Sequence, residues 1–256
     1  MNKTGLCSIS FRNLSVDEII LIIKKANLDG IEWGGDVHSI HGKIKLAEEI
    51  RKKTLNAGLC VSSYGSYYRT GISESENLLF KDVLASAVSL GAPIIRVWAG
   101  NKNYADYDIN EVNFIIKDIY RICEMAENEN ISIAFEYHGG TLTNCDDGVK
   151  KLQEMTQEIK NLSFYWQPPV GLSIELCLNG INYLKNIKKL SNIHVFQWDL
   201  IDSKIVRKPL IDGKNVWERY IGQCGNDDRY FLMEFVKNDN TEQFYADAKF
   251  LKGLLK

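Results

Sequence analysis

The stretch Ile131-Ser132-Ile133-Ala134-Phe135-Glu136-Tyr137-His138-Gly139-Gly140 decides the fold prediction. It begins as an apolar run, which is typical of a parallel strand buried on both faces. It then changes abruptly to a carboxylate, an imidazole and two glycines. A buried carboxylate is costly unless its charge is needed there. Since ligands bind at the carboxyl ends of the strands in sheets of alternating strands and helices, Glu136 is a candidate functional residue.

Three later apolar segments also lead into a side chain that can donate an electron pair. They are followed by Gln167, His194 and Glu234. Taken singly, a His or a Glu in such a place is usually a structural or solvated group. Four compatible donors at four successive strand ends are harder to explain in that way, so we expect a single metal site.

The rest of the chain predicts eight strands that alternate with eight helices. The expected strands are 5–10, 31–33, 59–64, 94–98, 131–136, 162–167, 193–198 and 230–235. The expected helices are 16–27, 44–56, 74–90, 112–126 with Asn110 as a plausible cap, 147–159, 176–190, 217–223 and 244–255, with a long polar loop at 199–213. Such alternation implies parallel strands and right-handed crossovers. At 256 residues the chain has the usual size of one closed barrel, so we predict a single-domain (β/α)8 TIM barrel over residues 1–256.

Composition excludes several classes of function. A formal net charge of −2 gives no basic surface for nucleic acid or an anionic membrane. No segment has the length and apolar character of a signal peptide or a membrane span. The six cysteines are scattered without a Cys-x-x-Cys motif, which favours reduced, buried thiols in a cytoplasmic protein.

The four donors Glu136, Gln167, His194 and Glu234 would converge on one rim of the barrel. Two carboxylates, an amide oxygen and an imidazole suit one divalent ion, most naturally Mn²⁺ or Mg²⁺, with water or substrate completing the coordination. A structural zinc site would use thiolates instead.

The chain also resembles the sugar phosphate isomerase/epimerase family, the xylose isomerase-like TIM barrels that include ketose 3-epimerases, hydroxypyruvate isomerase, inosose dehydratase and endonuclease IV. The resemblance covers nearly the whole chain. Its most specific parts are Phe135-Glu136-Tyr137-His138-Gly139-Gly140-Thr141-Leu142-Thr143, Tyr165-Trp166-Gln167-Pro168, Ile193-His194 and Met233-Glu234-Phe235. Such enzymes place a Glu, an Asp, a His and a Glu around one ion, which implies Glu136, Gln167, His194 and Glu234 as the ligands here.

The chain departs from the ketose epimerases at several of these positions. Gln167 stands where they have Asp, so the site brings one negative charge fewer. Val170, Leu142 and Leu200 stand where they tend to have a His, a second Glu and an Arg. The metal ligands are therefore kept while the usual substrate-binding residues are not, which argues against a ketose 3-epimerase in the narrow sense.

A metal site of this kind predicts proton transfer next to a carbonyl group. A divalent ion stabilises the enediolate that forms when the neighbouring carbon loses its proton. We expect Glu136 and Glu234 to serve both as ligands and as the acid/base pair. The products distinguish an epimerase, an isomerase and an inosose-type dehydratase, and a non-catalytic sugar-binding protein stays open as an alternative. A nuclease is disfavoured because the chain has only four histidines and no net positive charge.

Five further residues are candidate substrate contacts because they lie near expected strand ends. Aromatic faces suit the C–H faces of a sugar, and His or Arg suits its oxygens, although each could equally be barrel packing or a structural ion pair. These candidates are Trp33, Tyr64, Arg96, Trp98 and His138. The expected partner is therefore a small carbohydrate, and the sequence leaves the oligomeric state open, a homo-oligomer included.

Overall fold

Eight parallel strands close into a barrel in the computed structural model, which describes residues 2–202 and 204–256. The order around the barrel is β1-β10-β7-β6-β5-β4-β3-β2, so the first and last barrel strands are neighbours. The barrel strands are β1 (Lys3–Cys7), β2 (Gly30–Gly34), β3 (Cys60–Thr70), β4 (Ile94–Ala99), β5 (Ser132–Glu136), β6 (Leu162–Trp166), β7 (Leu190–Val195) and β10 (Tyr230–Met233). The predicted (β/α)8 TIM barrel is confirmed.

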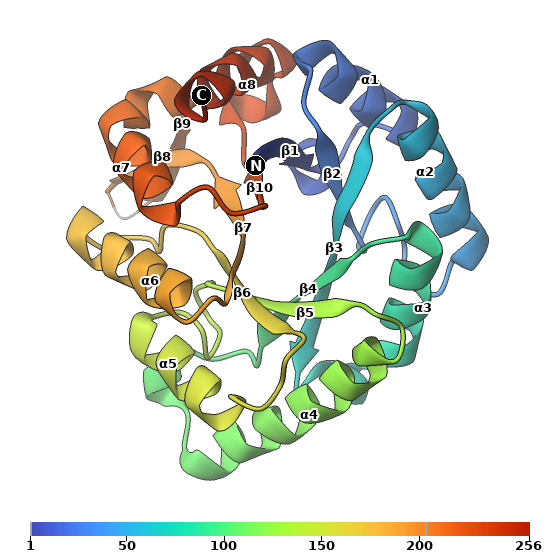
Figure 1. Ribbon diagram of the computed structural model, residues 1–256, viewed down its shortest axis with the longest axis vertical. Coiled ribbons are helices and arrows are strands. Elements are labelled where there is room, and N and C mark those ends of the chain that lie inside the picture. The colour runs from blue at the N-terminus through green and yellow to red at the C-terminus, as the bar shows by residue number, and fades with distance from the viewer. Residues whose placement is uncertain (1, 203) are drawn as a thin grey trace.

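A ring of helices surrounds the barrel, as Figure 1 shows. The helices are α1 (Val16–Ala26), α2 (Ile44–Asn56), α3 (Phe80–Leu90), α4 (Ile109–Glu127), α5 (Asp146–Met155), α6 (Ile174–Asn186), α7 (Lys214–Cys224) and α8 (Thr241–Leu254). Within the described residues, no helix combines the length and the apolar character needed to cross a membrane.

The strand side chains alternate between two cores. In β5, Ile133 and Phe135 belong to the large core, whereas Ala134 belongs to a small cluster with residues of three other barrel strands. Because successive side chains of a strand point to opposite faces, the large core lies between barrel and helices and the small cluster lies inside the barrel. Residues two positions after members of the small cluster point inward at the carboxyl ends of their strands. They are Glu136, Gln167 and Glu234.

Several predicted boundaries are corrected by the structure. Helix α3 begins at Phe80 rather than residue 74, because Asn77 has a left-handed backbone (φ 65°) that separates it from a short 3-10 turn, Ser73–Glu76. Helix α6 ends at Asn186 rather than residue 190, and Lys188 is also left-handed (φ 57°). The cap of α4 is Asp108 and not Asn110: the Asp108 carboxylate accepts from the backbone N–H groups of Asn110 and Glu111.

The predicted polar loop at 199–213 is wrong. Two strands, β8 (Gln197–Ile201) and β9 (Lys204–Lys208), instead pair there as an antiparallel hairpin. Residue 203, which falls within the predicted loop, lies outside the described residues. A separate strand β7 ends at Val195, so the predicted strand at 193–198 spans two elements. The hairpin lies outside the barrel order, between β7 and α7.

Candidate functional site

Glu136, His194 and Glu234 meet inside the mouth of the barrel. The Nδ1 atom of His194 lies 2.9 Å from Glu136 Oε1 and 3.5 Å from Glu234 Oε2. All three side chains are buried, and the His194 side chain is 0% exposed. Three of the four predicted ligands are thus brought together from β5, β7 and the residue after β10.

The fourth predicted ligand, Gln167, lies directly after β6 and is also buried. Its Nε2 atom donates to the carbonyl oxygen of Tyr137 at 2.7 Å. Its Oε1 atom is buried and has no hydrogen-bond partner. The amide oxygen is therefore free to coordinate a cation, while the amide nitrogen is held by its hydrogen bond to the neighbouring strand end.

Arg96 and Trp98 hold the Glu136 carboxylate. Arg96 Nη1 donates to Glu136 Oε2 at 2.5 Å, and Trp98 Nε1 donates to the same oxygen at 2.6 Å. Burial acts to raise the pKa of Glu136, but the charges of Arg96 and then His194 outweigh it and hold the pKa well below its usual range. Both residues are candidate substrate contacts from the sequence, and in the structure each of them donates a hydrogen bond to Glu136.

Two residues of this cluster, Glu32 and Cys7, are not among the sequence candidates. Glu32 Oε1 accepts from Arg96 Nε at 2.9 Å and lies 3.6 Å from His194 Nε2. Burial opposes its charge, yet Arg96 and then His194 lower the pKa of Glu32 to about 2. Cys7 ends β1 and is 1% exposed. A carboxylate between two apolar strand residues, Ile31 and Trp33, is the signal that could have identified Glu32.

Glu234 and His194 are protonated more readily than usual. Burial raises the pKa of Glu234 to about 7, against the lowering effect of the His194 charge. Burial disfavours the imidazolium of His194, but the surrounding Cys7, Glu234 and Glu136 outweigh burial and raise the pKa of His194 well above its ordinary value. Burial also raises the pKa of the Cys7 thiol, so that group is protonated at neutral pH. Without a cation, protons therefore balance part of the negative charge of this cluster.

The donor set fits a divalent metal ion. Among the buried side-chain atoms that lack a hydrogen-bond partner are Gln167 Oε1, His194 Nε2 and Glu234 Oε2. Such atoms are uncommon in folded proteins because burial without a partner is costly. Here they belong to three of the four predicted ligands, and each can give an electron pair to a cation once His194 and Glu234 have released their protons.

Trp33 and Tyr64, by contrast, have structural surroundings. Trp33 is 0% exposed and its indole N–H donates to Thr54 of helix α2 at 3.2 Å. Tyr64 is also 0% exposed, and its hydroxyl contacts the Ser39 carbonyl oxygen and His41 Nδ1, each at 2.7 Å. Both belong to the core between barrel and helices, and neither side chain is open to a substrate in this structure.

A pocket of about 580 Å³ opens next to the cluster. It is lined by loops after β4, β5, β6 and β10 and by the β8–β9 hairpin, through residues that include Asn103, His138, Gln167, Trp198 and Phe235. His138 is partly exposed, and its ring centroid lies 4.5 Å from that of Trp98. Of the five candidate substrate contacts, His138 is the one that lines this pocket.

Comparisons with known proteins agree with this architecture. The chain is 25% identical to a 3-dehydroshikimate dehydratase of Bacillus anthracis over 278 aligned residues, which covers 97% of this chain and 96% of that protein. The crystal structure of the probable 3-DHS dehydratase AsbF of Bacillus anthracis superimposes with a TM-score of 0.81 at 18% identity, covering 98% of each chain. The crystal structure of the 3-keto-D-glucoside 4-epimerase YcjR of E. coli superimposes with a TM-score of 0.72 at 14% identity, covering 99% of each chain.

These structural likenesses show the fold, and the names of the similar proteins are those of enzymes. The family model described as xylose isomerase-like TIM barrel matches residues 20–171, which is more than half of the chain. The closed parallel barrel has the same architecture. The chain therefore belongs to the family of xylose isomerase-like TIM barrels.

Proposed function

We propose that the chain is a divalent-metal-dependent isomerase or epimerase of a sugar or a sugar-like hydroxy-carbonyl compound. The observation that carries this proposal is the buried contact of Glu136, His194 and Glu234 at the mouth of the barrel. Family membership supports it, since the similar proteins include an epimerase that acts on a 3-keto-D-glucoside.

The proposed ligands are Glu136, His194 and Glu234, with the amide oxygen of Gln167 as the fourth. Mn²⁺ and Mg²⁺ suit this mainly hard set. When bound, such an ion stabilises the negative charge that develops on substrate oxygens as the neighbouring carbon loses its proton. His138, which lines the adjacent pocket, is the proposed contact for a substrate hydroxyl.

The two carboxylates of the acid/base pair are not equivalent. Glu136 accepts hydrogen bonds from Arg96 and Trp98, which favour its ionised form and make it a weak base. Glu234 Oε2 has no hydrogen-bond partner, so no donor is held against the lone pair that would take a proton. We therefore assign proton removal to Glu234, and assign to Glu136 the role of ligand and weaker partner.

Dehydration is the second candidate, favoured by the similarity to a 3-dehydroshikimate dehydratase over nearly the whole chain. In that reaction the base takes the C–H proton, a C=C bond forms, and the β-hydroxyl leaves with a proton as water. One base is enough for this chemistry, whereas two-base epimerisation uses a second group on the opposite face of the substrate to return a proton.

Exchange of substrate protons with solvent tests the proposal. Protein freed of metal by a chelator and then supplied with Mn²⁺ is incubated in deuterated water with ketoses, sugar phosphates, inososes and 3-dehydroshikimate. We expect deuterium to enter the carbon next to the carbonyl of at least one compound, detected by NMR. A new C=C bond in the product identifies dehydration, and a rearranged or inverted carbon identifies isomerisation or epimerisation.

Glu234→Gln keeps the size of the side chain but removes the base, so it should abolish deuterium uptake. The matched control is Glu129→Gln, at an exposed position just before β5 at the opposite end of the barrel, which should leave uptake unchanged. Undiminished uptake in Glu234→Gln would remove Glu234 from the proposed role. No uptake with any compound would favour the non-catalytic alternative.

A further inference from the structure

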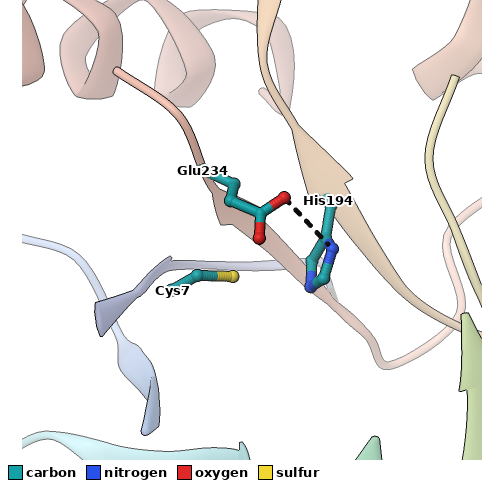
Figure 2. A group of neighbouring side chains, drawn as sticks. All are labelled: Cys7, His194 and Glu234. Atoms are coloured by element: carbon teal, nitrogen blue, oxygen red, sulfur yellow. Dashed lines mark ion pairs between the residues drawn. The ribbon is translucent and has the colours of Figure 1, made fainter. Parts of the chain in front are cut away.

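Cys7 lies beside the proposed ligands, as Figure 2 shows. The potential ligand atoms of Cys7, His194 and Glu234 all lie within 4.8 Å of one another. The strand register explains this proximity: Cys7 pairs with Glu32 of β2, and the preceding Leu6 pairs with Met233, the residue before Glu234. A thiol at this point of β1 is therefore placed by the barrel itself.

We propose that Cys7 is a further ligand of the metal centre, as a thiolate, and that it shifts the preference of the site from Mg²⁺ towards softer ions such as Zn²⁺ and Co²⁺. This inference rests on the metal site of the proposed function, to which it adds a residue and a class of ion. Thiolate ligands select softer metals, while carboxylate and carbonyl oxygens alone suit Mg²⁺ and Mn²⁺.

The residues beside Cys7 carry two buried atoms that lack a hydrogen-bond partner. His194 Nε2 and Glu234 Oε2 are both buried without a hydrogen-bond partner, on side chains that are 0% and 5% exposed. Both residues belong to the same compact group as the sulfur. Their ion-pair contacts are long, 3.6 Å from His194 Nε2 to Glu32 Oε1 and 3.5 Å from Glu234 Oε2 to His194 Nδ1, so a cation at this place would give each of them a close partner.

The charge of the donor set also favours a thiolate ligand. Gln167 contributes a neutral amide where a carboxylate would add a negative charge, so Glu136 and Glu234 are the anionic members of the set. Coordination replaces the S–H bond of Cys7 by a metal–sulfur bond and releases the proton to solvent. The thiolate then supplies the third negative charge.

Packing alone is the competing explanation for Cys7. Cys7 belongs, with Ala134, Tyr165 and Leu232, to a small apolar cluster inside the barrel, where a free cysteine can act as a small hydrophobic side chain. Packing predicts no bond to a metal, so spectroscopy of the metal centre separates the two explanations.

Co²⁺ is the probe, because cobalt bound to a thiolate gives a ligand-to-metal charge-transfer band in the near ultraviolet that oxygen and nitrogen ligands do not give. Co²⁺ is added to the metal-free full chain, bound cobalt is measured by elemental analysis, and the absorption spectrum is recorded. We expect one ion per chain and a charge-transfer band. Cys7→Ser should still bind Co²⁺ but lose the band. Its affinity for Zn²⁺ should fall at least about tenfold, because even the loss of a residue that only supports a metal ligand typically costs that much.

The controls are Cys60→Ser, which removes an exposed thiol, and Cys123→Ser, which changes a buried thiol on helix α4. Both should keep the band. Bound cobalt without a band in the wild-type chain would overturn the role of Cys7 and leave the proposed function intact. Failure of the wild-type chain to bind Co²⁺ at all would overturn both. The wild-type spectrum decides the matter even if Cys7→Ser fails to fold.

Discussion

Arg96 lies between two buried carboxylates and pairs with both of them. Its guanidinium donates to Glu32 through Nε and to Glu136 through Nη1, and all three side chains are at most 3% exposed. Charges so deeply buried are tolerated only when they are paired and hydrogen-bonded. Arg96 is thus a structural requirement for the carboxylate that we propose as a metal ligand.

We therefore expect Arg96→Met to destabilise the protein by roughly 3–5 kcal/mol, because it leaves Glu32 and Glu136 buried without their cation. The free energy of unfolding in urea measures this effect. Arg219→Met is the matched control: Arg219 pairs with Glu175 at the surface, with side chains 45% and 74% exposed. Its loss should cost at most about 1 kcal/mol. Equal effects of the two substitutions would contradict the account of Arg96.

At this scale the sequence predicts part of the cluster and not the rest. Glu136, His194 and Glu234 could be identified because each follows or interrupts an apolar strand at its carboxyl end. The roles of Arg96 and Trp98 could not be predicted from sequence. At a strand end, a side chain that contacts substrate and one that holds a neighbouring carboxylate occupy the same kind of sequence position. Trp33 directly follows Glu32 in β2, and successive side chains of a strand point to opposite faces. Glu32 therefore faces the interior of the barrel, while Trp33 faces helix α2.

Helix α4 shows how an element begins where its first backbone N–H groups find acceptors. Asp108 accepts from Asn110 and Glu111, and the Glu111 side chain accepts in return from the Asp108 backbone N–H, which together form a capping box. Asn110 lies inside the first turn, where its own side chain is exposed.

Asp108→Ala should therefore cost about 1 kcal/mol of stability, the usual contribution of an N-cap side chain. Asn110→Ala should change stability by less than about 0.5 kcal/mol, as is usual for a surface substitution. Thermal and urea unfolding of the two variants provide the measurement. A larger loss for Asn110→Ala would restore Asn110 as the cap and contradict the observed helix start.

Elements were predictable where hydrophobic periodicity is long, as in α4, and less so where polar and apolar residues mix. The hairpin of β8 and β9 was missed because Asp199, Asp202 and Lys204 give the segment the composition of a loop. Its strand character comes from Ile201, Ile205 and Val206, whose branched side chains favour extended structure, and from pairing that local composition does not reveal. The hairpin contributes Trp198 and Ile205 to the proposed substrate pocket.

The whole barrel was predictable from the number and alternation of its elements, because eight such units of this size close naturally. The convergence of residues from distant parts of the chain follows from that closure. What the sequence did not supply is the register between β1 and its neighbours, which places Cys7 beside Glu32 and next to Glu234. Register depends on the pairing of whole strands, not on any local motif.

The stability of the metal-free protein should depend on pH through the same cluster. Glu234 and His194 have raised pKa values in the folded state, so they bind protons more tightly there than in the unfolded chain. The stability that they contribute is complete below their unfolded-state pKa values and is lost as pH rises through the folded-state values, about 7 for Glu234. Glu32 and Glu136 have lowered pKa values and lose their contribution only in acid.

Mn²⁺ should reverse this trend because metal binding requires deprotonated ligands. We expect the increase in melting temperature on adding Mn²⁺ to grow from pH 6 to pH 8, and a chelator to abolish it. His194→Ala should show no increase at either pH, while His41→Ala, which removes an imidazole outside the proposed ligand set, should keep the increase. A metal effect that weakens as pH rises would contradict the assignment of His194 and Glu234 as ligands.

Direct binding of Mn²⁺ is the measurement closest to the central claim, that Glu136, His194 and Glu234 hold one divalent ion at the mouth of the barrel. The electron paramagnetic resonance signal of free Mn²⁺ is followed while metal-free protein is added at pH 8. The account predicts one site per chain in the wild-type protein, and loss of that site in His194→Ala and in Glu234→Gln. A wild-type chain that leaves the free signal unchanged, or a site that survives both substitutions, would contradict it.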